Sequence, residues 1–278
     1  MKNKMNTAHK TAFIGFGNMA RALINGAILA NQLQNDHIVV SSPSLNNGTQ
    51  STPLPIAKNN REAARQAEII FLCTKPNIIP SICTEIADVI AGKNSKPLIV
   101  SIAAGIPTST IEKHLHCNDI PIIRAMPNTP VSVGLGVIGL YANPFVTLQQ
   151  RTKVSAILES TGVLVQMNNE LDLDKLTAIS GSGPAYFLLM EEMLVNAAKK
   201  LGLTDEVANT LVQQTMLGTS VLASKSPLRF EALRAQVTSK GGTTAAAIDH
   251  FIEGGIEQLV NGAVLAAYHR AIELSTTS

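Results

Sequence analysis

The sequence predicts an α/β protein in which a doubly wound, parallel β-sheet is followed by an all-α domain. Short apolar runs such as EIIFLC (residues 68–73) and LIVSI (residues 98–102) are typical of strands buried on both faces of a sheet. Helical patterns separate these runs, which indicates a parallel sheet covered by helices. After residue 169 the strand patterns cease, and apolar residues recur every three or four positions up to residue 274.

Each element follows from these local patterns. The expected strands are Thr11–Gly15, Ile38–Ser41, Glu68–Cys73, Leu98–Ile102, Ile120–Arg124, Val137–Tyr141 and Val163–Gln166. The helices expected between them are Asn18–Gln32, Asn60–Ala67, Ile78–Ala91 and Leu148–Thr161. The helices expected in the second domain are Ala185–Leu201, Asp205–Ser224, Leu228–Gln236, Thr243–Glu253 and Ile256–Leu274.

These patterns divide the 278 residues into three parts. Residues 1–10 are expected to form a flexible tail, residues 11–167 the sheet domain, and residues 168–278 the helical domain. Several of the later helices are apolar beyond one stripe and contain small residues such as Gly218 and Gly262. We therefore expect this domain to associate with a second copy of the chain; the alternative is the core of a large monomer.

Composition excludes several classes of function. Net charge is +2, aromatic residues make up 4% and tryptophan is absent, so no nucleic-acid surface is indicated. No apolar run is long enough to span a membrane. Three cysteines without metal-ligand spacing predict no metal site and a reducing, cytoplasmic location.

The first predicted strand runs into GFGNMA, residues 15–20. This spacing matches the dinucleotide fingerprint of Rossmann-type domains, with alanine in its third position. The first glycine would make the tight turn, and the second would admit a pyrophosphate to the start of the following helix. A merely structural turn is the alternative. The cofactor-binding residues predicted here are Ile14, Gly15, Phe16, Gly17, Asn18 and Met19.

The end of the second strand bears on the choice of nicotinamide cofactor. An acid here usually holds the ribose hydroxyls of NAD, but this chain has Ser41 and Ser42. Two hydroxyls can donate hydrogen bonds to the 2′-phosphate of NADPH, which favours this cofactor. No arginine stands nearby to bind the phosphate in a bidentate pair, so use of NADH also stays open. Asn60 is either a further adenosine contact or a helix cap.

Two more segments end strands at the same edge of the sheet, where ligands of doubly wound folds bind. In SIAAG (residues 101–105) small residues would admit a flat nicotinamide; close packing is the alternative. Lys75 either reaches the cofactor or is solvated. The cofactor-binding residues predicted in these segments are Cys73, Thr74, Lys75, Pro76, Ala103, Ala104 and Gly105.

The segment VTSKGGTTAAAI, residues 237–248, gathers small donors before a helix. Gly241 and Gly242 permit conformations in which successive N–H groups converge on an anion, and the helix starting near Thr243 adds its positive end. Ser239 adds a further donor. Taken alone, the segment would only be a polar helix cap.

The sequence resembles pyrroline-5-carboxylate reductases over nearly the whole chain beyond residue 10. The resemblance rests on GFGNMA, FLCTKP, SIAAG, RAMPNTP (124–130), LTAISGSGPAYF (176–187) and VTSKGGTTAAAI. It implies a Rossmann domain, a helical domain shared between subunits of a homodimer, and larger rings of dimers. It also implies reduction of the cyclic imine 1-pyrroline-5-carboxylate to L-proline by hydride transfer from NADPH, the last step of proline biosynthesis. The SGSG turn either caps a helix beside the site or contacts substrate.

The resemblance also implies the substrate site. The implied substrate-binding residues are Glu170, Ser239, Gly241, Gly242, Thr243 and Thr244, of which Thr244 is the catalytic candidate because its hydroxyl would hold the imine nitrogen. Lys240 either attracts the carboxylate or faces water. Two other interpretations stay open: a β-hydroxyacid-type dehydrogenase and a nicotinamide-binding regulator without turnover.

Overall fold

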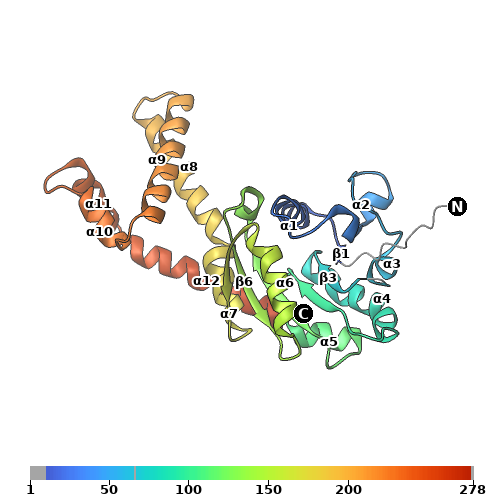
Figure 1. Cartoon of the computed structure of the whole chain (residues 1–278). Helices are drawn as coiled ribbons and strands as arrows, with labels where there is room; N and C mark the ends of the chain where they lie inside the picture. The colour runs from blue at the N-terminus through green and yellow to red at the C-terminus, as the bar shows by residue number, and fades with distance from the viewer. Residues whose placement is uncertain (1–10, 66, 277–278) are drawn as a thin grey trace. The chain divides into compact units, whose positions relative to one another are not determined.

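The structure, a computed structural model, describes residues 11–65 and 67–276, so the tail predicted for residues 1–10 lies outside the described residues. Residues 11–182 and 267–276 form one compact unit, and residues 183–266 form another. Figure 1 follows the chain through both. Among the helices that the structure describes, none is both long and apolar enough to cross a membrane.

The first unit is built on a seven-stranded sheet of order β2-β1-β3-β4-β5-β6-β7. Its strands are β1 (Thr11–Ile14), β2 (Ile38–Ser41), β3 (Ile69–Leu72), β4 (Leu98–Ser101), β5 (Ile122–Pro127), β6 (Gly136–Ala142) and β7 (Gly162–Gln166). The strands β1 to β5 are parallel, as predicted. The chain order reverses between β1 and β3, and such a reversal is where doubly wound sheets bind ligands.

The strand β6 departs from the predicted parallel arrangement. It pairs antiparallel with β5, and β7 then runs parallel to β6. The reason is the length of the connection: only the short helix η3 (Thr129–Val133) and its flanking turns join β5 to β6. A parallel crossover needs a dozen or more residues, so the chain must return antiparallel.

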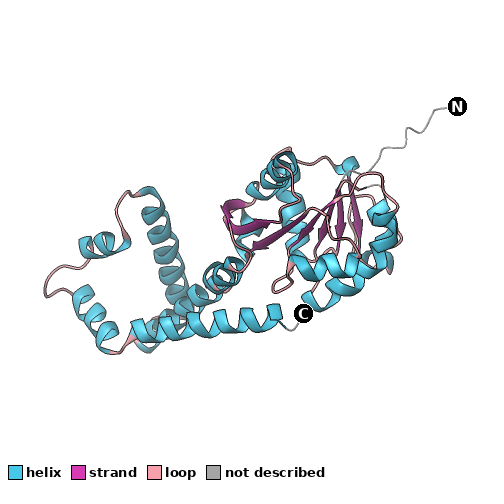
Figure 2. Ribbon diagram, turned by 90° about the horizontal axis from the view of Figure 1, so that it is seen from below, coloured by secondary structure: helices cyan, strands magenta, loops and turns pink. Residues whose placement is uncertain are grey.

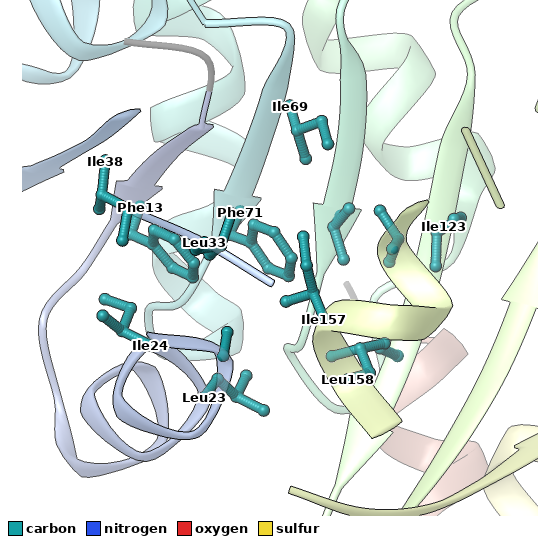
Figure 3. Close-up of a cluster of buried hydrophobic side chains, with 14 of the residues drawn as sticks. Phe13, Leu23, Ile24, Leu33, Ile38, Ile69, Phe71, Ile123, Ile157 and Leu158 are labelled. Atoms are coloured by element: carbon teal, nitrogen blue, oxygen red, sulfur yellow. The ribbon is translucent and has the colours of Figure 1, made fainter. Parts of the chain in front are cut away.

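Helices cover both faces of this sheet (Figure 2). On one face α1 (Asn18–Leu29) and α6 (Leu148–Glu159) pack over side chains such as Phe13 and Phe71, whose rings stack 4.5 Å apart (Figure 3). On the other face α3 (Asn60–Arg65), α4 (Ile79–Ala91) and α5 (Thr108–Leu115) pack over alternate strand residues such as Ile70. Burial of both faces explains the almost wholly apolar strand sequences.

Short elements complete the unit. The helix α5 is absent from the elements expected from sequence, because its eight residues, TSTIEKHL, include only two large apolar side chains, Ile111 and Leu115. The remaining ones are α2 (Pro43–Asn46), η1 (Asn35–His37), η2 (Pro76–Ile78), α7 (Asp172–Leu176) and the π-helical turn η4 (Thr177–Gly181).

The predicted start of the helical domain at residue 168 differs from the division in the structure, which falls after Ser182. Residues 168–182 fold with the sheet because two polar side chains bind them to it. Glu170 pairs with Arg124 of β5, and Asn128 donates to the Ser180 carbonyl oxygen.

The second unit is helical throughout. It contains α8 (Gly183–Lys200), α9 (Asp205–Lys225), α10 (Phe230–Gln236), α11 (Thr243–Glu253) and the first part of α12 (Ile256–Thr276), whose last turns belong to the first unit. In this unit only Gly183 and Ala208 are buried. Large apolar side chains such as Phe187 and Leu259 are 66% and 71% exposed in the single chain.

Candidate active site

The tight turn after β1 requires glycine at position 15. Gly15 has φ +98°, and a Cβ there would lie 2.4 Å from the carbonyl oxygen of Cys73. Its N–H donates to the carbonyl oxygen of Ser41 over 2.8 Å, and the Cys73 N–H donates to Ile14 over 2.7 Å. These bonds hold the ends of β1, β2 and β3 together, so the predicted cofactor segments of all three strands meet at one edge of the sheet.

The start of α1 is open, as a pyrophosphate site requires. Gly17 is the N-cap residue, no side chain caps the helix there, and a Cβ on Gly17 would meet no described atom within 4 Å. Ala20, in the first turn of α1, is 1% exposed and lies on the buried face of the helix. Ile14 and Phe16 are buried, so these two predicted residues offer backbone atoms rather than side chains. The N–H groups at a helix start bind anions when nothing else occupies them.

The residues predicted to bind the adenosine end form a hydrogen-bonded chain. Ser41 Oγ donates to Asn60 Oδ1 over 2.8 Å, and Asn60 Nδ2 donates to Glu85 Oε2 over 2.7 Å. Ser42 Oγ lies 2.9 Å from Ser44 Oγ. The structure thus brings Ser41 and Asn60 together, and it places a carboxylate behind them that sequence reasoning missed.

The segment after β3 contains an unsatisfied polar atom. Among the residues that the structure describes, Thr74 Oγ1 is buried without a hydrogen-bond partner, and the Thr74 methyl group lies against the Gly15 turn. Such an atom costs free energy unless a ligand satisfies it. Beside it, burial raises the pKa of the Cys73 thiol well above its usual range, so this thiol stays protonated and uncharged. Lys75 is exposed and precedes η2.

The SIAAG loop has a structural reason for its last glycine. Gly105 has φ +70°, and a Cβ there would lie 2.9 Å from Leu274 Cβ and 3.1 Å from the Leu274 carbonyl carbon. The end of α12 therefore packs directly against this loop. Ala103 is buried and Ala104 is half-buried at the carboxyl end of β4. The small residues serve this packing; contact with nicotinamide stays a prediction.

Glu170 has partners in the first unit. Its Oε1 accepts from Arg124 Nη1 over 2.9 Å and from the Thr108 N–H over 2.7 Å, and its Oε2 accepts from Thr108 Oγ1 over 2.9 Å. The Arg124 side chain is 6% exposed and that of Glu170 is 20% exposed. This carboxylate therefore neutralises a buried arginine and caps α5; contact with substrate, which the resemblance implied, stays a prediction.

The RAMPNTP and SGSG motifs meet through Asn128. Its Nδ2 donates to the Ser180 carbonyl oxygen over 3.0 Å, and its Oδ1 accepts from the Val137 N–H over 2.8 Å. Asn128 is 7% exposed, and Ser180 lies in the π-helical turn before α8. Sequence reasoning used RAMPNTP only as a mark of resemblance and assigned its residues no role.

The predicted substrate segment lies in the second unit. Gly241 has φ +73°, and the Gly242 N–H donates to the Ser239 carbonyl oxygen over 3.0 Å. No described side chain caps the start of α11 at Thr243. Ser239 and Lys240 are exposed and Thr244 is half-buried. Locally, the segment thus presents free helix N–H groups beside several hydroxyls, which suits a carboxylate.

The sheet and its glycine turn define a dinucleotide-binding protein of the Rossmann type. Comparisons with known proteins specify the family. A family model described as pyrroline-5-carboxylate reductase dimerisation matches residues 170–274, and one described as coenzyme F420-dependent NADP oxidoreductase matches residues 10–105.

Similar proteins cover almost the entire chain. A pyrroline-5-carboxylate reductase of Pseudomonas aeruginosa is 38% identical over 96% of this chain and 97% of its own. The solved structure of a pyrroline-5-carboxylate reductase from Coxiella burnetii is 38% identical, with TM-score 0.87, over 96% of this chain and 99% of its own. A pyrroline carboxylate reductase of Plasmodium falciparum, solved with NADP bound, is 32% identical, with TM-score 0.85, over 96% of this chain and 98% of its own.

The chain therefore belongs to the pyrroline-5-carboxylate reductase family. The resemblance and fold class predicted from sequence are confirmed. The protein is an oxidoreductase that uses a nicotinamide cofactor and carries a dimerisation domain. The comparisons favour neither the β-hydroxyacid dehydrogenase nor the regulator without turnover.

Proposed function

We propose that this protein reduces 1-pyrroline-5-carboxylate to L-proline, the last step of proline biosynthesis, with NADPH as the preferred cofactor. The relatives that match nearly the full chain are named for this substrate. The observation that carries the proposal is the uncapped start of α11 behind the Gly241 turn, because a small imine acid offers its carboxylate as its main handle.

The residues of the first unit fit a dinucleotide. The open start of α1 suits a pyrophosphate, and the unsatisfied Thr74 hydroxyl needs a partner that the described protein atoms do not supply. When bound, the cofactor supplies the hydride, and the protein supplies binding and orientation. The residues proposed to hold it are Ile14, Gly15, Phe16, Gly17, Asn18, Met19, Ser41, Ser42, Asn60, Cys73, Thr74, Lys75, Pro76, Ala103, Ala104 and Gly105.

Preference for NADPH over NADH rests on the hydroxyl groups of Ser41 and Ser42, and on the NADP bound to the relative from Plasmodium falciparum. Glu85 works against this preference, since its carboxylate hydrogen-bonds to Asn60 and would repel a 2′-phosphate. We therefore expect selectivity for NADPH to be moderate.

In the substrate segment, Gly241 and Gly242 form the turn, and the backbone N–H groups from Thr243 onward and the hydroxyl of Ser239 bind the carboxylate. Thr244 hydrogen-bonds to the ring nitrogen and holds it as it gains its proton. A threonine hydroxyl is a poor proton source by itself, so the substrate enters protonated or water relays the proton. Positioning then supplies most of the rate enhancement.

The assembly proposed is a homodimer through residues 170–274, and its mass in solution tests whether dimers join into larger rings. The three cysteines, all within the described residues, form no disulfide. A reducing, cytoplasmic location accords with this pattern and stays a proposal.

The proposal is tested by nicotinamide oxidation with 1-pyrroline-5-carboxylate and NADPH or NADH, with proline measured as product. Thr244→Ala should lower kcat roughly 10²-fold, because a donor at the reacting atom is lost, and Thr244→Ser should restore most of it. Thr238→Ala is the matched control, since that hydroxyl bonds to Arg234 O in the preceding helix.

Oxidation without proline, or none with either cofactor in folded protein, would refute the proposed activity. Full activity of Thr244→Ala would keep the activity and remove Thr244 from the mechanism.

A further inference from the structure

The loop that follows β4 contacts two other segments of the first unit, namely the segment that contains Glu170 and the end of α12. At its end, the N–H and hydroxyl of Thr108 donate to Glu170. In its middle, Gly105 takes the left-handed conformation and touches the last turn of α12 at Leu274. Ile106, the next residue, is 1% exposed and belongs to the core between the sheet and α4. The position of Ala103–Gly105 thus depends on where α12 ends.

A buried carboxylate fixes the end of α12. Asp174 is 4% exposed, and its Oδ2 lies 2.9 Å from Ser275 Oγ. Ser275 Oγ also lies 2.7 Å from the Ala271 carbonyl oxygen. A hydroxyl has one proton, so it serves one of these acceptors at a time. A nearly buried carboxylate without this donor would carry a large desolvation cost.

Both anchors stand on one short segment. Glu170 and Asp174 lie between β7 and the π-helical turn, where they hold the start of α5 and the end of α12 respectively. The helix α12 starts at Ile256, directly after α11, which carries the proposed substrate residues, and its last turns belong to the unit with the sheet. The helix α12 therefore begins soon after the proposed substrate segment in the sequence and ends against the proposed nicotinamide loop.

We propose that Ser275 and Asp174 are positioning residues, which lock the end of α12 against Gly105 and thereby hold the Ala103–Gly105 loop in place for the cofactor. This role rests on the proposed function, since that function places the nicotinamide at this loop. Neither side chain touches the reacting atoms; both act through α12 and the loop. A small displacement of a reacting group lowers the rate far more than it lowers binding.

The first measurement is amide hydrogen exchange of residues 103–106, which needs no activity. Ser275→Ala should accelerate this exchange about tenfold, because the loop loses its outer support. Thr276→Ala is the matched control: the exposed Thr276 hydroxyl bonds only to Ile272 O and Glu273 O in the contacts described for α12, so its loss should leave the loop unchanged.

The second measurement separates positioning from a general loss of structure. Ser275→Ala should lower kcat roughly tenfold and change KM for the imine less than threefold. Ser275→Thr retains the hydroxyl and should restore kcat. Ser275→Asp places a second carboxylate against Asp174 and should act more strongly than Ser275→Ala, and Asp174→Asn should relieve it in the double variant.

Unchanged exchange at residues 103–106 in both Ser275→Ala and Ser275→Asp would overturn the inference. Equal effects of Ser275→Ala and Thr276→Ala would also overturn it, since fraying of α12 would then be the cause. Failure of the proposed function appears separately, as a wild-type protein that reduces no imine; the exchange measurement still decides whether α12 holds the loop.

Discussion

Removing the charge of Glu170 should destabilise the protein, because this carboxylate is the partner of a buried arginine. The change Glu170→Gln keeps the size of the side chain and leaves the buried Arg124 without its carboxylate. The loss of one partner of a buried pair costs about 3–5 kcal/mol. Because Glu170 is 20% exposed and glutamine still offers an acceptor oxygen to Thr108, we expect about 2–3 kcal/mol.

The assay is urea unfolding at one fixed protein concentration, since dimerisation makes stability depend on concentration. Asp172→Asn is the matched control two residues along the chain. Its ion pair with Lys175 is exposed, 34% at Asp172 and 63% at Lys175, so its removal should cost less than about 1 kcal/mol. A double-mutant cycle with Arg124→Met then isolates the coupling between Arg124 and Glu170.

Two further readouts distinguish the two roles of Glu170. If it binds substrate, Glu170→Gln raises KM for the imine with little loss of stability; if it acts through Arg124 and Thr108, stability falls and KM changes little. Burial raises the pKa of Tyr141, and the Glu170 and Glu112 carboxylates raise it further. Glu170→Gln should therefore lower the Tyr141 pKa. A loss of stability below about 1 kcal/mol, equal to that of Asp172→Asn, would refute the reasoning.

Two other predictions concern the cofactor turn and the pH dependence of stability. Gly15→Ala should abolish cofactor binding in a fluorescence titration, because Gly15 has φ +98° and the added Cβ would lie 2.4 Å from the Cys73 carbonyl oxygen. Gly48→Ala is the control: Gly48 also has a positive φ, but no atom lies within 4 Å of the added Cβ, so binding should stay intact. The Arg61 side chain hydrogen-bonds to Asp88 and holds its pKa below the usual value of 3.8, so this pair stabilises the fold above about pH 4 and loses its effect as the pH falls through the lowered pKa. Asp88→Asn should make the loss of stability with falling pH less steep in that range. An unchanged dependence of stability on pH below about pH 4 would contradict the role given to the Arg61–Asp88 pair.

The sequence predicted those features that depend on neighbouring residues. Strand runs such as Ile69–Leu72 are apolar at every position, and the structure buries every one of them. The Gly15 turn was predicted from its spacing, and its left-handed φ shows why no other residue fits. Period and turn chemistry act within a few residues, so they can be read without knowledge of the fold.

Features that join distant residues could not be predicted in this way. Glu170 and Arg124 are 46 positions apart, and no local pattern in NNELDLDK marks the acid that pairs with a buried arginine. The packing partner of Gly105 could not be predicted either, because Leu274 lies at the far end of the chain. The signal that could have identified the pair is the arginine within an otherwise apolar strand, since a buried charge requires a partner.

The apolar helices predicted for the second unit leave large side chains exposed in the single chain, which indicates that this unit associates with a partner. Its helices were expected to be apolar on more than one face, and in the single chain Phe187, Leu201 and Leu259 are 66%, 85% and 71% exposed. Burial of one such side chain contributes about 1.5–3 kcal/mol, so several of them left in water remove most of the stabilisation available to a unit of this size. The family model describes residues 170–274 as a dimerisation domain, and we expect association through this domain to bury these side chains. The proposed substrate segment, residues 239–244, lies within this unit, so we expect the order of that segment to depend on association as well as on the local turn.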